Sequence, residues 1–177
     1  IAELSATGTP SSSNFLRGDN SWQEAGGGVV VQVVNVQSGA VATATTTMPD
    51  DNTIPQSDEG AQFMSLAVIP TSASNKLRID VAIILGVDTG ASTITGALFQ
   101  DATAGALAST IHYAYNGSRA YGVNFTHYMA AGTTSETTFK VRAGIEDADT
   151  ITFNGYSAGR IHGGVLSSSI TITEIAV

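Results

Sequence analysis

Short runs of β-branched and aromatic residues recur along the chain from Val29 onward, and they constrain its fold more than any other feature. In the run LRIDVAIIL, residues 77–85, apolar side chains occupy every second position, which is the pattern of a half-buried strand. Clusters of Gly, Asn, Asp and Ser separate the runs and have the chemistry of turns. No stretch has the capped, amphipathic pattern of a helix of about ten residues or more. The other predicted strands are residues 29–36, 63–70, 94–100, 107–115, 121–129, 136–144, 149–153 and 167–177.

Strands this short, joined by turns this frequent, predict an all-β fold, either an antiparallel sandwich or a barrel. The jelly roll, an antiparallel β-sandwich, is the commonest solution for a chain of 177 residues. Residues 1–28 show no apolar periodicity and end in three glycines, which is typical of a flexible joint. We therefore expect a stalk or linker segment at residues 1–28 and a jelly-roll head at residues 29–177.

Charge is sparse and acidic in this chain. It carries 7 Lys and Arg against 15 Asp and Glu, a net charge of −8, and only 12% of its residues are charged. The acidic balance argues against nucleic acid as a partner, because phosphates require a basic surface. No run of about 18 apolar residues is present, so we expect no membrane insertion. A monomer with so little charge would expose much neutral and apolar surface, and the composition therefore favours an oligomer.

Two parts of the sequence resemble bacteriophage tail fibres. The segment LSATGTPSSSNFLRGDNSW, residues 4–22, resembles a segment common in these fibres just before a distal domain. The C-terminal part resembles the tip domains of such fibres, which are typically trimeric jelly rolls similar in outline to tumour-necrosis-factor or C1q heads. The segments that carry this resemblance are TTFKVRAG (137–144), ITFNG (151–155), GRIHGG (159–164) and SSSITITEI (167–175). The resemblance implies a homotrimer in a virion assembled in the host cytoplasm. It further implies attachment to the remainder of the tail fibre and binding to a host surface glycan or outer-surface protein.

The tripeptide Arg17-Gly18-Asp19 is the one that integrins read, and we interpret it here as an ordinary turn. Gly18 permits the positive φ that a tight reversal needs, and Asp19 and Asn20 can bond their own backbone. Large apolar residues flank the tripeptide, and we expect them to pack the joint and to bury it in part. These residues are Phe15, Leu16 and Trp22.

Aromatic, amide and cationic side chains gather in HYAYNGSRAYG, residues 112–122, around an Asn-Gly hairpin signal. Tyrosine rings stack on the apolar faces of sugars, while amide and guanidinium groups donate hydrogen bonds to hydroxyls, so the combination is typical of a saccharide site. A second, similar loop is NGYSAGR, residues 154–160. The alternative is that these tyrosines pack across strands and cap the sandwich. The candidate receptor-binding residues are Tyr113, Tyr115, Asn116, Arg119, Tyr121, Asn154, Tyr156 and Arg160.

Catalytic and metal sites are not indicated by the sequence. The three histidines could be combined with many serines and aspartates, but serine is too abundant for any one of them to stand out as a nucleophile. The acidic residues cluster in turns, whereas a glycan-cleaving spike needs paired carboxylates about 5–10 Å apart in a groove. Asp50-Asp51 and Asp58-Glu59 could hold Ca²⁺ through carboxylate oxygens, but a solvated acidic loop is the simpler interpretation. We therefore expect no enzyme, no cofactor and no metal, and a purely structural virion cap or trimerisation domain is the alternative to receptor binding.

Overall fold

The computed structural model describes residues 7–9, 14–24, 28–88 and 90–177, and this part of the chain consists of strands and turns. Its single helical element is a 3-10 turn, η1 (His162–Gly164). None of its helices could span a membrane. The strands are β1 (Asn14–Leu16), β2 (Trp22–Glu24), β3 (Val30–Ser38), β4 (Ala42–Ala44), β5 (Ala61–Val68), β6 (Lys76–Val87), β7 (Ser92–Gln100), β8 (Ala108–Ala114), β9 (Arg119–Ala130), β10 (Thr137–Ile145), β11 (Ile151–Phe153), β12 (Gly155–Tyr156), β13 (Gly159–Arg160) and β14 (Ser168–Ile175).

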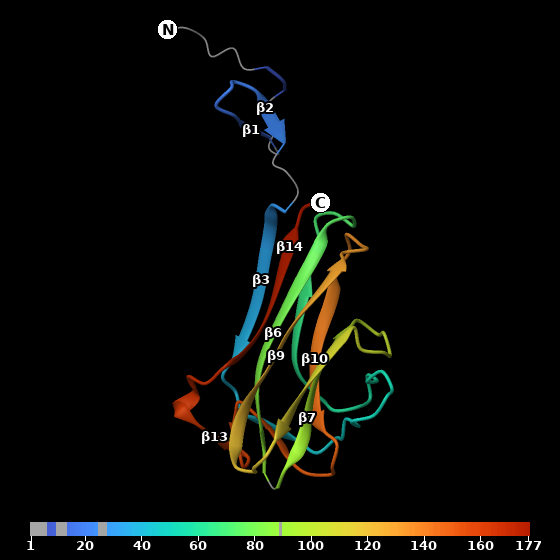
Figure 1. Cartoon of the computed structure of the whole chain (residues 1–177), viewed down its shortest axis with the longest axis vertical. Helices are drawn as coiled ribbons and strands as arrows, with labels where there is room; N and C mark the ends of the chain where they lie inside the picture. Colours follow the sequence, from blue (N-terminus) through green and yellow to red (C-terminus); the bar gives the residue numbers. More distant parts are fainter. Residues whose placement is uncertain (1–6, 10–13, 25–27, 89) are drawn as a thin grey trace.

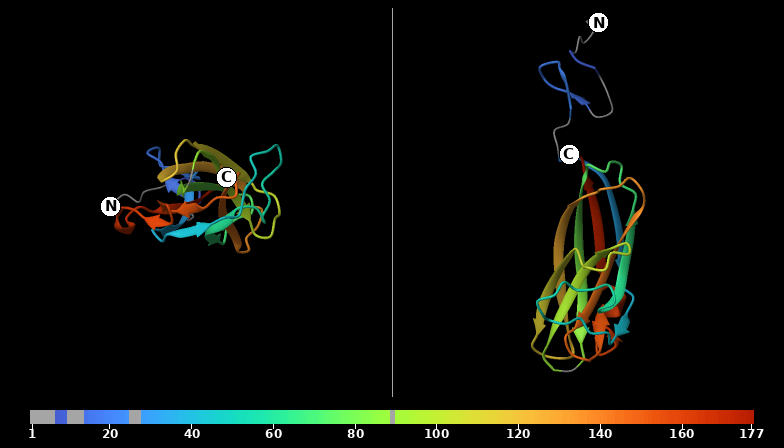
Figure 2. Two further views of the ribbon diagram at one scale, coloured as in Figure 1. Left: turned by 90° about the horizontal axis from the view of Figure 1, so that it is seen from below. Right: turned by 90° about the vertical axis from the view of Figure 1, so that its right-hand side faces the viewer.

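Eight of these strands form two antiparallel sheets that pack face to face (Figure 1, Figure 2). The first, here called the β6 sheet, has the order β3-β14-β6-β9. Where the pairing of β14 with β6 ends, the short strand β11 pairs with the last residues of β6, and β4 pairs with β11. The second, the β10 sheet, has the order β5-β10-β7-β8. Strands that follow one another along the chain mostly lie in different sheets, as in an eight-stranded jelly roll. The predicted all-β jelly roll is therefore confirmed.

Strand β6 supplies the centre of the core between the two sheets. Its inward residues Leu77, Ile79, Val81, Ile83 and Leu85 are at most 2% exposed, as the alternating pattern predicts. They belong to one cluster with inward residues of β7, β10 and β14. Full burial of each such side chain contributes about 1.5–3 kcal/mol, so this cluster is the main source of stability in the head.

A loop, residues 45–60, covers the outer face of the β10 sheet. Met48 is fully buried there and packs against Phe99, which points outward from β7. Gly144 of β10 leaves the room for this contact, since a Cβ at Gly144 would lie 2.9 Å from the backbone nitrogen of Met48. Arg142 fastens the end of the loop by donating to the carbonyls of residues 59 and 60 at 2.8 and 2.7 Å. Strand β7 is consequently buried on both faces.

The Arg-Gly-Asp tripeptide lies in a tight turn, as predicted, between β1 and β2. The Arg17 amide donates to the Ser21 carbonyl at 2.9 Å, and the Asn20 amide donates to the Arg17 carbonyl at 3.0 Å. The positive φ falls on Asn20, at 66°, and not on Gly18. The carboxylate of Asp19 accepts hydrogen bonds from the Ser21 hydroxyl and amide, at 2.7 and 3.1 Å, and these bonds lower the pKa of Asp19.

The expected partial burial of this turn is wrong for the single chain. Phe15 is 51% exposed, and the side chains of Arg17 and Asp19 are exposed by 53% and 57%. The physical reason is the size of the hairpin, which has three residue pairs and no second layer of its own. The tripeptide therefore sits at an exposed tip.

Candidate functional site

The hairpin predicted at residues 112–122 joins β8 to β9 at one end of the sandwich. In the β6–β9 pair, Arg119 lies opposite Val87, and Lys76 lies opposite Ala130. The turn at 115–118 is therefore at the far end from Lys76, and we call this the distal end (Figure 1). At the other end, called proximal, the chain enters β3 beside the C-terminus.

The two loops that were predicted separately meet at the distal end. The hydroxyls of Ser118 and Ser157 lie 3.1 Å apart, which joins the 115–118 turn to the β12–β13 hairpin across 39 positions of sequence. Gly86 of β6 allows the hairpin to lie this close. A Cβ at Gly86 would approach the carbonyl oxygen of Gly155 to 2.3 Å and the Cβ of Tyr156 to 2.6 Å. The fold thus forms one composite tip from both candidate loops.

Tyr113 and Tyr115 present aromatic surface to solvent at this tip. They are 49% and 75% exposed, and their rings meet edge to face with centroids 5.0 Å apart. Ile111, which is 60% exposed, shares the outer side of β8 with Tyr113. Ile111 was not predicted as a site residue, although side chains two residues apart on a strand share a face and Ile111 precedes Tyr113 by two. An edge-strand face of this kind can stack against the apolar face of a flat ligand.

Tyr121 is half-buried and anchors the turn. Its hydroxyl donates to the Asn116 carbonyl at 3.0 Å, and its ring packs against His112 with centroids 4.7 Å apart. The ring also lies against the main core. The backbone of Asn116 is thereby held, while the side chains of Asn116 and Arg119 are exposed beside the tyrosine pair.

The structure corrects the prediction for Asn154, which is 1% exposed and is out of reach of a surface ligand. Its amide nitrogen donates to the carbonyls of Ser38 and Ala40 at 2.7 and 3.0 Å, and its amide oxygen accepts from the Ser168 hydroxyl at 2.7 Å. Buried carbonyls need such partners, and asparagine tolerates the φ of 56° found here. Asn154 is a structural residue of the loop.

Tyr156 and Arg160 lie toward the side of the tip. Tyr156 is half-buried where β12 crosses Gly86. Arg160 is exposed, and its guanidinium lies against the backbone of Gly164 in η1, where a Cβ would come within 2.5 Å of a guanidinium nitrogen. The residues that the structure brings together and leaves exposed are therefore Tyr113, Tyr115, Asn116 and Arg119, with Tyr156 and Arg160 beside them.

The acidic loop considered as a cation site is folded by its own carboxylates. Asp51 accepts from the hydroxyl and the amide of Thr53 at 2.6 and 2.7 Å, and these bonds lower the pKa of Asp51. Glu59 accepts from the Gln56 amide at 2.8 Å. Within the described ranges, no group of three or more His, Asp or Glu side chains could hold a metal ion.

Comparison with known proteins yields distant similarities of fold. No protein-family model and no curated protein matches the chain. The Eiger TNF of S. frugiperda has a TM-score of 0.48 and 12% identity over 81% of this chain and 93% of that one. The infectious bursal disease virus Gx strain has a TM-score of 0.40 and 7% identity over 88% and 42%. The enzymatically active domain of bacteriophage CBA120 tailspike protein 4 has a TM-score of 0.29 and 12% identity over 70% and 18%.

These similarities carry no argument about function. The jelly-roll assignment rests on the strand order of the two sheets. Because one fold hosts many unrelated functions, the function has to be argued from the exposed residues of this chain.

Proposed function

We propose that this chain is the receptor-binding head of a bacteriophage tail fibre, or of a related virion appendage, and that it binds a host surface saccharide at its distal end. The observation that carries the proposal is the composite tip, where the exposed pair Tyr113 and Tyr115 lies beside Asn116, Arg119 and the β12–β13 hairpin. The resemblance of residues 4–22 to tail-fibre segments supplies the biological setting. The proposed role is attachment, without cleavage of the receptor.

The geometry of the tip suits weak saccharide binding. Two exposed rings at an edge-to-face angle of 81° offer two differently oriented stacking surfaces. Asn116 and Arg119 can donate hydrogen bonds to sugar hydroxyls, and the Tyr121 hydroxyl already holds the turn between them. Little ordering is then required when a ligand arrives, which favours affinity.

We propose further that the head acts as a homotrimer. The inward apolar side chains of 77–85 and 170–172 are buried in the chain's own core, so a trimer interface has to be formed by other residues. The exposed valines at the start of β3, 44% to 57% exposed, are candidates, together with Phe15 and Leu16 of the hairpin. Three heads on one fibre would raise avidity without any new contact. A monomer mass in light scattering at micromolar concentration would contradict this part of the proposal.

The test of the proposed function uses Tyr115→Ala and Arg119→Ala in the whole chain. Both side chains are exposed, so we expect binding to host cells or to glycans on an array to fall about tenfold, while the melting temperature and the assembly state stay unchanged. Lys140→Gln, on the β10 sheet away from the tip, is the matched control. Unchanged binding by both variants would reject the tip as the receptor site. Failure of the unmodified chain to bind any host surface would favour the structural cap.

A further inference from the structure

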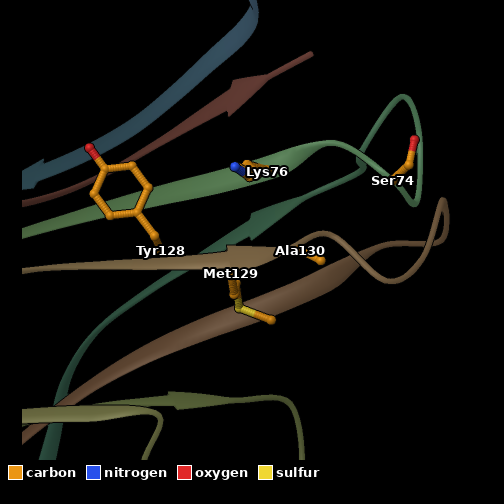
Figure 3. Close-up of a pocket in the computed structure, with 5 residues that line it drawn as sticks. All are labelled: Ser74, Lys76, Tyr128, Met129 and Ala130. Carbon is orange, nitrogen blue, oxygen red and sulfur yellow. The ribbon is translucent and has the colours of Figure 1, made fainter. Parts of the chain in front are cut away.

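A hollow of about 340 Å³ opens at the proximal end, between the start of β6 and the end of β9 (Figure 3). Figure 3 shows Tyr128 and Met129 on opposite sides of β9, so that the Tyr128 ring lies on the outer side of the sheet. Tyr128 is 57% exposed. The residues that line the hollow are Ser74, Lys76, Tyr128, Met129 and Ala130.

The register of the β6–β9 pair explains why the hollow exists. Lys76 lies directly opposite Ala130, whose small side chain leaves room beside it. Tyr128 lies opposite Arg78, one step further along the same outer face, and is therefore the diagonal neighbour of Lys76. A cation and an exposed aromatic ring consequently border the same space.

Lys76 is a cation that has no anionic partner within the described part of the chain. It makes no ion pair and no side-chain hydrogen bond there. The chain's other lysine, Lys140, donates to the Asp101 carbonyl at 2.6 Å, and Arg78 donates to Asp80 at 3.0 Å. Lys76 also borders a second hollow of about 320 Å³, lined further by Gly28 and residues 175–177. The space around its ammonium group therefore extends to both sides.

A buried carboxylate holds the wall of the hollow in place. Glu174 of β14 is fully buried and accepts hydrogen bonds from the Thr71 amide and hydroxyl, at 2.9 and 2.8 Å, and from the Asn75 side chain at 2.6 Å. It also accepts from the Ser72 amide at 3.3 Å and from the side chain of Gln32. Burial of a carboxylate is costly unless donors compensate it, and these donors lie mainly in the loop that precedes Lys76. The loop that carries Ser74 is thus ordered before any ligand binds.

We propose that this hollow binds a carboxylated sugar. The Lys76 ammonium group pairs with the sugar carboxylate, the Tyr128 ring stacks against an apolar face of the sugar ring, and the Ser74 hydroxyl bonds a sugar hydroxyl. A neutral sugar would leave the ammonium group without its partner. The site lies at the opposite end of the sandwich from Tyr115 and uses none of the residues of the distal tip.

The test compares cellobiouronate, which carries one carboxylate, with neutral cellobiose, by calorimetry or saturation-transfer NMR on the whole chain. We expect the unmodified chain and Lys140→Gln to bind cellobiouronate, and to bind cellobiose at least about tenfold more weakly. Lys76→Gln and Tyr128→Ala should each weaken cellobiouronate binding by about tenfold or more. Both side chains are exposed, so the melting temperature should stay unchanged.

Three results would overturn the inference. The first is no binding of cellobiouronate by the unmodified chain at millimolar sugar, and the second is full binding by Lys76→Gln. The third is equal binding of a hexa-aspartate peptide, which would show a general attraction for carboxylates and not a sugar site. Tyr115→Ala should bind cellobiouronate normally, so this test is independent of the one at the distal tip.

Discussion

The two ends of the sandwich are built from the same strands, but their loops are held in different ways. At the distal end, neutral groups hold the two candidate loops, through the Ser118–Ser157 contact and the bond from Tyr121 to the Asn116 carbonyl. At the proximal end, a buried ionised carboxylate, Glu174, gathers donors from β3 and from the loop before β6. The proximal loop therefore depends on one titrating carboxylate, whereas the two contacts that hold the distal loops involve none.

The largest effect is expected from Glu174→Gln. The new amide places two hydrogen-bond donors among the donors of Thr71 and Asn75, which leaves buried polar groups unpaired. We expect the free energy of unfolding in urea to fall by about 2–3 kcal/mol. Glu136→Gln, a change at an exposed carboxylate, is the control and should have little effect. A loss no larger than that of the control would mean that Glu174 does not hold the loop.

A second prediction uses pH on the unmodified chain. Burial raises the pKa of Glu174, but hydrogen bonds from Gln32, Asn75 and Thr71 outweigh it, and the pKa lies below its ordinary value of 4.5. A carboxyl whose pKa is lowered by folding adds stability above its ordinary pKa, and that stability is lost as the pH falls through the folded pKa. The urea concentration at the midpoint of unfolding should therefore decrease as the pH is lowered below about 4.5. Glu174→Gln should show a smaller fall, and an identical profile would contradict this assignment.

A third prediction concerns the distal end. Tyr121→Phe removes the hydroxyl that donates to the Asn116 carbonyl but keeps the ring on His112. We expect a loss of about 1 kcal/mol in the free energy of unfolding. Tyr113→Phe, at an exposed position, should cost nothing and serves as the control. An equal loss in both variants would show that the Asn116 bond is not the cause.

The smallest effect is expected in the N-terminal hairpin. Arg17 and Asp19 lie 3.8 Å apart and both are exposed, so their pairing contributes little to stability. Asp19→Glu should leave the melting temperature of the head unchanged. Because Asp19 is engaged by Ser21, we also expect no change in the attachment of animal cells to immobilised protein. Loss of a measurable integrin interaction in this variant would show that the exposed tripeptide is an adhesion ligand.

Local pattern predicted most of the architecture of this chain. The alternation in residues 77–85 and the turn chemistry between runs indicated the strands, because period 2 is a property of the extended backbone itself. The strands β1, β2, β4, β12 and β13 were not predicted, since two or three residues are too few to show a period. The tight turn at residues 17–20 was also predicted correctly, because Asp and Asn side chains favour turns by hydrogen-bonding to the nearby backbone.

The composition of the sites was decided by tertiary structure. Period 2 places Glu174 on the inward side of β14, in line with Ile170 and Ile172, but its donors lie up to 142 positions away in the sequence. The burial of Asn154 and the meeting of Ser118 with Ser157 likewise depend on which strands pair. A residue's own neighbours determine whether it is in a strand or a turn, whereas its partners follow from the strand order that buries the whole apolar core.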